Sequence, residues 1–537
     1  MSRRLSGWLV LLAAGAAVLL AAGPADRAAG ETRKGGTLRI GSHVNVDVDP
    51  GIGYSSSSWL ISDATCAKLF DYRAEPGAGV ARLVPEVVER STVSNDGRTY
   101  TFELKRTFRF HTGVRVTARS FADAFERVAQ PKLPSPAKNY LREIIGAAAV
   151  IDGKAESISG IRALGRYRLQ IRLTEPLPDL TARLTMPFFC PILPNTPIDP
   201  AGVENPAGSG PYYVAERITN QRIVLRRNPF YRGDRPGNVD QILWTIGGSL
   251  ETCRVAVEED RTDFCAEPGA PPPMYRALAE KYGINRPGGQ LFANPALATW
   301  FFAFNHNRPA FRGPGQIALK KAINYAIDRP ALARAFGYLA GKRTDQLLPP
   351  AFARTESIYP LGGASPTVAR RWYAKARIKP TRLVLYTWNF PNAVTQAQIF
   401  AFNLKQLGID LEVKYFDLDA VYEKVRTPGE PFDIVLEGWA PDYPDAAGFF
   451  VPLLSREGPL SLAVNDPKIH RRMEAANSLS GEARQRAWAD LDVDLMRNDP
   501  PWAAFAHTQR RFLVSKSLGC FVDHPILGVE ITALCKK

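Results

Sequence analysis

Hydrophobic and polar positions follow strand or helix periods along most of the first half of the chain. Alternating or short apolar runs predict strands at 34–41, 99–104, 166–173, 223–226 and 239–246. Helical spacing predicts helices over 59–70 and, with Thr117 as the N-cap, over 118–128. This half is therefore predicted to be rich in strands and poor in long helices.

The pattern changes from Trp300 onward. Strands are predicted at 300–305, 383–388, 411–416 and 432–436, and helices within 316–336 and at 394–407 and 418–426. The β-α-β-α-β order from 383 to 436 predicts an α/β unit with right-handed crossovers and a largely parallel sheet. Ligands of such sheets collect outside the carboxyl ends of the strands.

The stretch FDIVLEGWAPDYPD, residues 432–445, is the strongest candidate for such a ligand site. Its apolar start predicts a buried strand, and Gly438, Pro441 and Pro444 predict that the chain then leaves the sheet. Trp388 ends a neighbouring predicted strand, so two strands bring tryptophans to the same rim. The competing interpretation is an ordinary loop with one core tryptophan.

The C-terminal segment predicts a second crossing between lobes. A helix near 482–496 is followed by Pro500 and Pro501, and the pattern becomes strand-like again from Phe505. We expect residues 501–537 to return to the first lobe, so that two strands form a hinge.

Length and charge limit the classes of protein. The chain has 537 residues, too many for one core, and 45% hydrophobic with 23% charged residues is typical of soluble globular proteins. The formal net charge is +15, but no Lys/Arg block or zinc-finger spacing supports a nucleic-acid partner. The six histidines are scattered, and Asp47-x-Asp49-x-Gly51 is too incomplete for a calcium loop, so no metal or other cofactor is expected.

The first thirty residues have the pattern of a secretory signal. Arg3 and Arg4 precede an apolar run over 8–22, and small residues follow to Gly30. A membrane helix is the competing interpretation, although the run is short for a span of about 20 residues. No cysteine ends the run, which argues against a lipoprotein anchor. The mature protein is expected to be exported.

Six cysteines fit an oxidising compartment, but sequence does not decide their pairing. Cys253 with Cys265, and Cys520 with Cys535, are near enough to close short loops. Cys66 and Cys190 are as compatible with buried free thiols as with a disulfide.

Several stretches in order resemble the extracytoplasmic solute-binding proteins of peptide and nickel ABC importers, family 5. The matching stretches are 35–40, 83–89, 94–110, 116–125, 208–214, 302–305, 309–311 and 319–329 with Leu332. The resemblance covers nearly all of the mature chain. It implies an α/β, two-lobed periplasmic-binding-protein fold with an extra subdomain in the first lobe. The expected divisions are 1–30 for the signal, 31–290 for the first lobe with an insertion at about 56–165, 291–500 for the second lobe and 501–537 for the return.

The resemblance also implies the ligand and the residues that hold it. A periplasmic, monomeric, non-catalytic protein is expected to capture a peptide or related small solute between the lobes and to pass it to an inner-membrane ABC permease. In the family an Asp at the place of Asp442 receives the peptide's α-ammonium. The expected ligand-binding residues are Val46, Asp47, Trp388, Gly438, Trp439, Ala440, Asp442 and Tyr443.

Departures from the family pattern leave the ligand open. Pro441 and Pro444 remove backbone N–H donors from the loop, and no basic residue can be assigned to the peptide's carboxyl end, so an opine, sugar or metal chelate stays possible. The rival functions are a secreted hydrolase with Ser209 as the nucleophile and a peptide-sensing or chaperone-like protein. For the hydrolase, the GxSxG motif is not spelled around Ser209.

Overall fold

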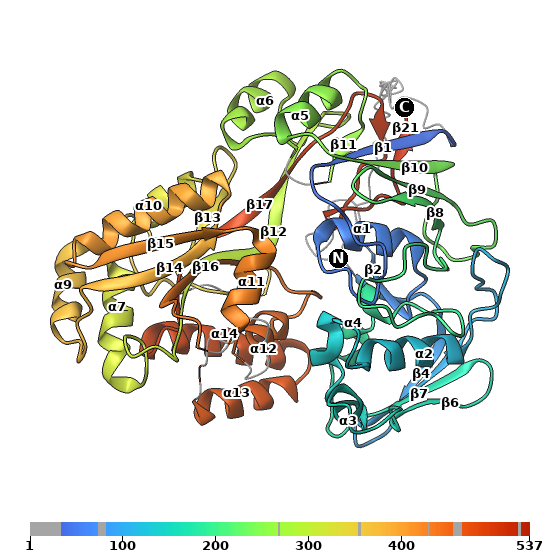
Figure 1. Ribbon diagram of the computed structural model, residues 1–537, viewed down its shortest axis with the longest axis horizontal. Coiled ribbons are helices and arrows are strands. Elements are labelled where there is room, and N and C mark those ends of the chain that lie inside the picture. Colours follow the sequence, from blue (N-terminus) through green and yellow to red (C-terminus); the bar gives the residue numbers. More distant parts are fainter. Residues whose placement is uncertain are drawn as a thin grey trace, which may run out of the picture.

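Two lobes lie side by side and are joined by two long strands, β12 (Leu291–Phe304) and β17 (Trp502–Leu513) (Figure 1). The structure is a computed structural model. It describes residues 34–73, 82–266, 269–352, 356–427, 429–454, 464, 466–524 and 528–537. The predicted signal peptide lies outside these residues.

The first lobe contains, among its described residues, a five-stranded sheet of order β11-β1-β10-β9-β8. Its strands are β1 (Thr37–Ser42), β8 (Tyr212–Ile218), β9 (Arg222–Arg227), β10 (Gln241–Ile246) and β11 (Phe264–Cys265). Alternate residues of β1, Leu38 and Ile40, face the core of this lobe. The pattern of burial thus matches the alternation that predicted these strands.

A second sheet of the first lobe has the order β4-β5-β7-β6 and packs against helix α2. The strands are β4 (Val88–Val93), β5 (Thr99–Leu104), β6 (Ile161–Ala163) and β7 (Arg168–Arg172), and α2 spans Ala118–Ala129. Thr117 caps α2 as predicted, in a reciprocal capping box with Ser120. Strand β7 belongs to this sheet and lies beyond residue 165.

The second lobe is built on a sheet of order β13-β17-β12-β16-β14-β15. The strands not yet bounded are β13 (Gly341–Arg343), β14 (Arg382–Trp388), β15 (Asp410–Phe416) and β16 (Ile434–Trp439). Strand β14 is parallel to β15 and β16, but β12 is antiparallel to β16 and β17. The parallel sheet predicted over 383–436 is therefore confirmed, and the strands that join the lobes, which lie outside this stretch, extend it with antiparallel pairs.

The strand that precedes the candidate loop is longer than predicted. The sequence placed its end at residue 436, but Gly438 and Trp439 continue it, paired with Trp300 and Thr299 of β12. A Cβ on Gly438 would lie 2.5 Å from the Trp300 ring, so glycine is needed for this close approach. The chain leaves the sheet only at Ala440, ahead of Pro441.

Helices and short strands complete both lobes. In the first lobe they are α1 (Ser56–Thr65), β2 (Phe70–Arg73), β3 (Arg82–Pro85), η1 (Pro136–Tyr140), α3 (Ala147–Ile151), α4 (Leu180–Arg183), η2 (Pro187–Phe189), α5 (Leu250–Glu258), η3 (Pro272–Met274) and α6 (Tyr275–Tyr282). In the second they are η4 (Pro314–Gln316), α7 (Ile317–Ala326), α8 (Arg329–Arg334), α9 (Pro366–Ala374), α10 (Pro391–Lys405), α11 (Leu418–Arg426), α12 (Ala447–Leu454), α13 (Pro467–Asn477) and α14 (Gly481–Asn498).

The helix predicted over 59–70 is shorter and begins earlier, because Ser55 caps α1 and Cys66 is extended. The single helix expected within 316–336 is two helices, because Ile327 is extended and Asp328 caps α8.

The segment after β17 lies against the first lobe. Val514 bridges Phe264 of β11, and Leu518 and Ile531 pack in the same core as Leu38. The short strands here are β18 (Leu518–Gly519), β19 (Asp523–His524), β20 (Gly528–Val529) and β21 (Cys535–Lys536).

Three disulfides join the six cysteines: Cys66–Cys190, Cys253–Cys265 and Cys520–Cys535. The free-thiol alternative for Cys66 and Cys190 is therefore wrong. These two residues are 124 positions apart, so only the fold brings them together.

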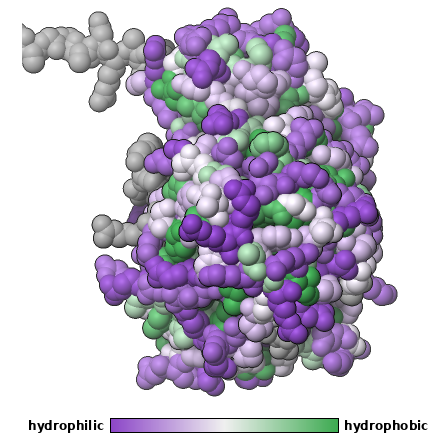
Figure 2. Space-filling model, turned by 90° about the vertical axis from the view of Figure 1, so that its left-hand side faces the viewer, coloured by the Kyte–Doolittle hydropathy of each residue, from purple (hydrophilic) through white to green (hydrophobic). Residues whose placement is uncertain are grey.

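The outer face of the second lobe, which carries α9 and α10, is mostly hydrophilic with small separate hydrophobic spots (Figure 2). No helix in the described part of the chain is long and apolar enough to cross a bilayer.

Candidate functional site

Asp442 of the second lobe is bonded to two tyrosines of the first. The Tyr54 hydroxyl donates to both carboxylate oxygens, at 2.9 Å to Oδ2 and 3.1 Å to Oδ1. The Tyr140 hydroxyl, at the end of η1, donates to Oδ2. The carboxylate therefore lies where the two lobes meet.

Burial controls the electrostatics of this group. It raises the pKa of Asp442 to about 6, against the two tyrosine hydrogen bonds, which lower it. Burial, and next the charge of Asp442, raise the pKa of both Tyr54 and Tyr140 well above the usual value, so both remain hydroxyl donors. Among the described residues, Asp442 accepts hydrogen bonds from these two neutral hydroxyls, and neither is a cation.

The loop that carries Asp442 is tied at both ends. The Trp439 indole Nε1 donates to the Gly448 carbonyl at 2.9 Å. Asp445 accepts the Ala447 N–H at 2.8 Å and pairs with Arg484 of α14 at 2.9 Å. These bonds hold Asp442 at a set position beyond β16.

Tyr443 makes a second junction between the lobes. Its ring is 1% exposed and packs in the first-lobe core that includes Phe188 and Leu180. Its hydroxyl donates to Asp179 at 2.6 Å. Asp179 also pairs with Arg183 at 3.2 Å and with Arg484 at 3.4 Å. Tyr443 thus holds the lobes together, and its hydroxyl is already occupied.

Trp388 and Trp439 pack in the core of the second lobe, and Trp300 and Tyr422 pack against it. Trp388 is 3% exposed and stands edge-on to Trp300, with ring centroids 5.1 Å apart. The ring centroids of Tyr422, on α11, and Trp388 are 6.5 Å apart, and the Tyr422 hydroxyl donates a hydrogen bond of 3.1 Å to Glu437. Trp388 and Trp439 are buried, whereas Ala440 is exposed at the start of the loop.

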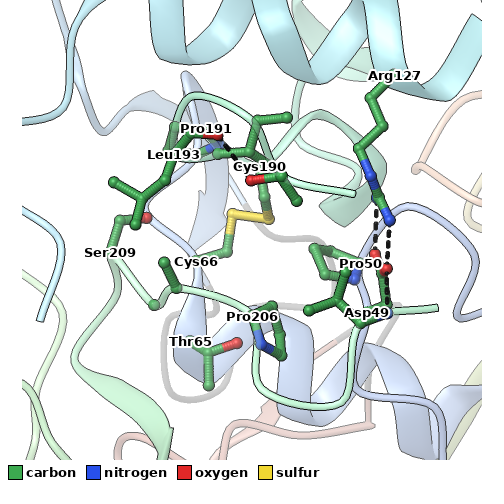
Figure 3. A pocket seen from close by; sticks show the side chains of 15 residues that line it. Asp49, Pro50, Thr65, Cys66, Arg127, Cys190, Pro191, Leu193, Pro206 and Ser209 are labelled. Carbon is green, nitrogen blue, oxygen red and sulfur yellow. Dashed lines mark hydrogen bonds and ion pairs between the residues drawn. A yellow bond between two sulfur atoms is a disulfide. The ribbon is translucent and has the colours of Figure 1, made fainter. Parts of the chain in front are cut away.

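The loop that carries Val46 and Asp47, two of the predicted ligand-binding residues, has a structural role at most of its positions. The Val46 side chain is fully buried in the first-lobe core, and its carbonyl accepts from Arg217. Asp47 is exposed and lies 3.9 Å from Arg217. Asp49 is paired with Arg127, as Figure 3 shows, at 2.6 Å. The same loop leads on to Tyr54, the residue that does reach Asp442.

Ser209 is part of a packed wall. It is 1% exposed, and its Oγ accepts the Ala67 N–H at 2.9 Å. Figure 3 shows it near the Cys66–Cys190 disulfide, lining a small pocket with Thr65 and Pro206. In the structure, the hydroxyl oxygen of this serine is a hydrogen-bond acceptor for the backbone.

Sequence reasoning missed Tyr54, Tyr140 and Glu437. Tyr54 and Tyr140 lie 388 and 302 positions from Asp442. No local pattern marks such partners. Glu437 could have been noticed as an acidic residue within an otherwise apolar strand. Among the described residues, no group of three or more His, Cys, Asp or Glu side chains could hold a metal ion.

A two-lobed molecule with a polar junction between its lobes has the architecture of a solute-binding protein. The family model of bacterial extracellular solute-binding proteins, family 5, middle region, matches residues 82–459. The chain belongs to this family of bacterial extracellular solute-binding proteins.

Named relatives and solved structures agree with this assignment. The chain is 24% identical to the periplasmic oligopeptide-binding protein OppA of Haemophilus influenzae, covering 76% of this chain and 78% of the relative. It is 25% identical to the periplasmic murein peptide-binding protein MppA of Escherichia coli, covering 80% and 81%. The fold matches clavulanic acid biosynthesis oligopeptide binding protein 2 with a TM-score of 0.83, at 22% identity over 94% of this chain and 96% of that one. The two-lobed fold expected from sequence is thereby confirmed.

Proposed function

We propose that this protein captures peptides with a free α-ammonium group between its lobes and presents them to a membrane ABC permease. The half-buried Asp442 carboxylate, bonded at the junction to the hydroxyls of Tyr54 and Tyr140, is the main support for this function. A buried carboxylate is costly to ionise without a cation. A ligand ammonium would supply one, and the tyrosine oxygens can accept its remaining hydrogens.

The names of the relatives support peptides as the ligand class. OppA is named an oligopeptide-binding protein and MppA a murein peptide-binding protein. Ala440, exposed between β16 and Pro441, keeps a backbone N–H and carbonyl that an extended ligand could pair with. Pro441 and Pro444 limit this pairing, so the ammonium contact would contribute a large part of the affinity.

The proposal includes the location, assembly and mode of action. The protein would be exported through cleavage of residues 1–30, would act as a monomer in the periplasm, and would not alter its ligand. Val46, Asp47, Trp388, Gly438, Trp439 and Tyr443 would shape the site around Asp442 rather than contact the ammonium. Ligand binding would favour the closed arrangement, which the permease would recognise.

Native mass spectrometry after incubation with a peptide library tests the function. We expect retained peptides with free N-termini and unchanged masses, and no retention of the N-acetylated library. Shortened peptides would instead establish a hydrolase. Retention of a non-peptide solute alone would exclude peptides as the ligand class. Normal peptide uptake by a strain that lacks the gene would point to a sensing or chaperone-like role.

A further inference from the structure

Glu437 is an acidic side chain sealed inside the wall of the second lobe. It is fully buried at the carboxyl end of β16. Its Oε1 accepts from the Tyr422 hydroxyl at 3.1 Å and from the Gly438 N–H at 3.3 Å. Its other oxygen, Oε2, has no hydrogen-bond partner within the described residues. A buried carboxyl oxygen without a partner among the protein's own groups is uncommon, and Oε2 is able to accept a hydrogen bond from a ligand group.

The groups around Glu437 suit an ionised acceptor. Tyr422 and Gly438 donate to it, and the charge of Arg426 also favours its ionised form. Burial outweighs all three and raises the pKa of Glu437 to about 8, so the side chain is mostly neutral at pH 7. Within the described part of the chain, no cation bonds Oε2 to offset the loss of hydration.

Aromatic rings continue from Tyr422, which bonds Glu437, through Trp388. The ring centroid of Trp388 lies 5.1 Å from that of Trp300 and 6.5 Å from that of Tyr422. The ring centroid of Phe390, which is 41% exposed, lies 6.2 Å from that of Trp388. Faces of tryptophan and tyrosine attract ammonium and guanidinium groups, and desolvation strengthens this attraction. The indole Nε1 of Trp388 is likewise buried without a partner in the described part of the chain.

We propose that Glu437, together with Tyr422 and Trp388, forms a second subsite that takes a cationic side chain of the ligand, an ammonium or a guanidinium group. This inference rests on the proposed capture of a peptide at Asp442. Peptides whose first residue is basic are the ligand class that it predicts, because such a residue carries two cations a side chain's length apart.

Tyr422 connects the two subsites. Its hydroxyl is bonded to Glu437, and its pKa is raised by burial first, then by the charge of Glu437 and, to a smaller degree, by that of Asp442. The charges of Tyr422 and Arg426 also act on the pKa of Tyr54 in the first lobe. The two carboxyl groups therefore act on one shared tyrosine, as neighbouring subsites would.

Arg426 is the group that opposes a ligand cation. Its guanidinium lies over the Tyr422 ring, 5.7 Å from the centroid, and its side chain is exposed. Water screens the charge of an exposed guanidinium, whereas the Glu437 side chain is fully buried. Binding of a ligand cation would thus ionise Glu437, and the proton would leave to the solvent.

Calorimetry with Lys-Ala-Ala and norleucine-Ala-Ala tests the subsite. The two peptides differ only in the side-chain ammonium. At pH 7 we expect the wild type to bind the lysine peptide at least tenfold more tightly and to release more protons with it, measured in phosphate and in Tris buffer. In Glu437→Gln the preference should fall to within twofold, with affinity for the norleucine peptide unchanged. An undiminished preference in Glu437→Gln, or equal proton release for both peptides, would overturn the proposal.

Two further variants keep the test decisive. Glu430→Gln removes another tyrosine-bonded glutamate of the second lobe, at 2.8 Å from Tyr386, and should leave the preference intact. Tyr422→Phe keeps the carboxyl group of Glu437 but removes the hydroxyl that donates to it. The pKa of Glu437 should therefore rise, and the lysine preference should begin at higher pH. A lysine preference that begins at the same pH as in the wild type would contradict the subsite. Binding of the norleucine peptide without any lysine preference would overturn this subsite alone, whereas failure to bind either peptide would overturn the proposed function with it.

Discussion

The Tyr443 hydroxyl of the second lobe donates a hydrogen bond of 2.6 Å to Asp179 of the first. Asp179 is 4% exposed, and Arg183 and Arg484 approach it from the two lobes. Burial raises the pKa of Asp179, but the two arginines and Tyr443 outweigh it, and the net pKa is lowered. This charged junction is one of the contacts that opening of the lobes would have to break, together with the tyrosine hydrogen bonds to Asp442.

Tyr443→Phe should shift the protein toward an open arrangement. The variant removes a hydrogen bond to a buried carboxylate, a contact that contributes about 1.5–3 kcal/mol. We expect ligand affinity to fall roughly tenfold and the mean distance between dyes on the two lobes to increase, measured by single-molecule energy transfer.

Tyr359→Phe is the matched control. Its hydroxyl donates to the Met496 carbonyl at 2.8 Å within the second lobe. This variant should lower the free energy of unfolding without changing the distance between the lobes. An unchanged distance in Tyr443→Phe as well would show that the Asp179 junction does not hold the lobes closed.

Affinity for peptides should fall in acid because of Asp442. Burial raises the pKa of Asp442 to about 6, above the usual value of roughly 4, so the carboxyl group gains its proton as the pH falls through 6. The protonated group offers no charge to an ammonium. We expect constant affinity for an uncharged-side-chain peptide above about pH 7 and a loss of up to roughly tenfold per unit below pH 6.

Asp442→Asn provides the reference for this pH profile. The variant has no titrating group at this position, so its weaker binding should vary little between pH 5 and 7. Parallel profiles for wild type and variant, measured by calorimetry, would assign the pH dependence to another group.

Loss of the Cys66–Cys190 disulfide should destabilise the first lobe strongly. The bond spans 124 positions, and closing a loop of this length removes enough entropy from the unfolded chain to stabilise the fold by about 4–5 kcal/mol. The Cys66→Ala/Cys190→Ala variant should therefore unfold at lower denaturant concentration.

The Cys253→Ala/Cys265→Ala variant is the comparison for loop length. Its disulfide spans 12 positions, for which the same account gives about 3 kcal/mol. Denaturant titration should rank the long-range pair as the more costly loss, and the reverse ranking would contradict the entropic account.

Local patterns predicted much of the fold and only part of the candidate site. Strand β5 and helix α11 have the predicted bounds because alternation and helical spacing act within a few residues. The extension of β16 to Trp439 was missed because it depends on pairing with β12, far away in sequence. Asp442 was identified from its loop and from the family resemblance.

The partners of Asp442 could not be predicted for the same physical reason. Tyr54 and Tyr140 reach the carboxylate only when the two lobes meet, and neither tyrosine has a local signature. The buried position of Glu437 likewise depends on distant packing, which includes the hydrogen bond from Tyr422.

Calorimetry with one peptide in free and N-acetylated form measures whether Asp442 holds the free ammonium end of a peptide. The wild type should bind the free peptide more tightly by about 2 kcal/mol, roughly thirtyfold, because acetylation removes the charge that pairs with the carboxylate. Asp442→Asn should bind both forms with similar, weak affinity. Equal affinity of the wild type for the two forms would contradict this role of Asp442.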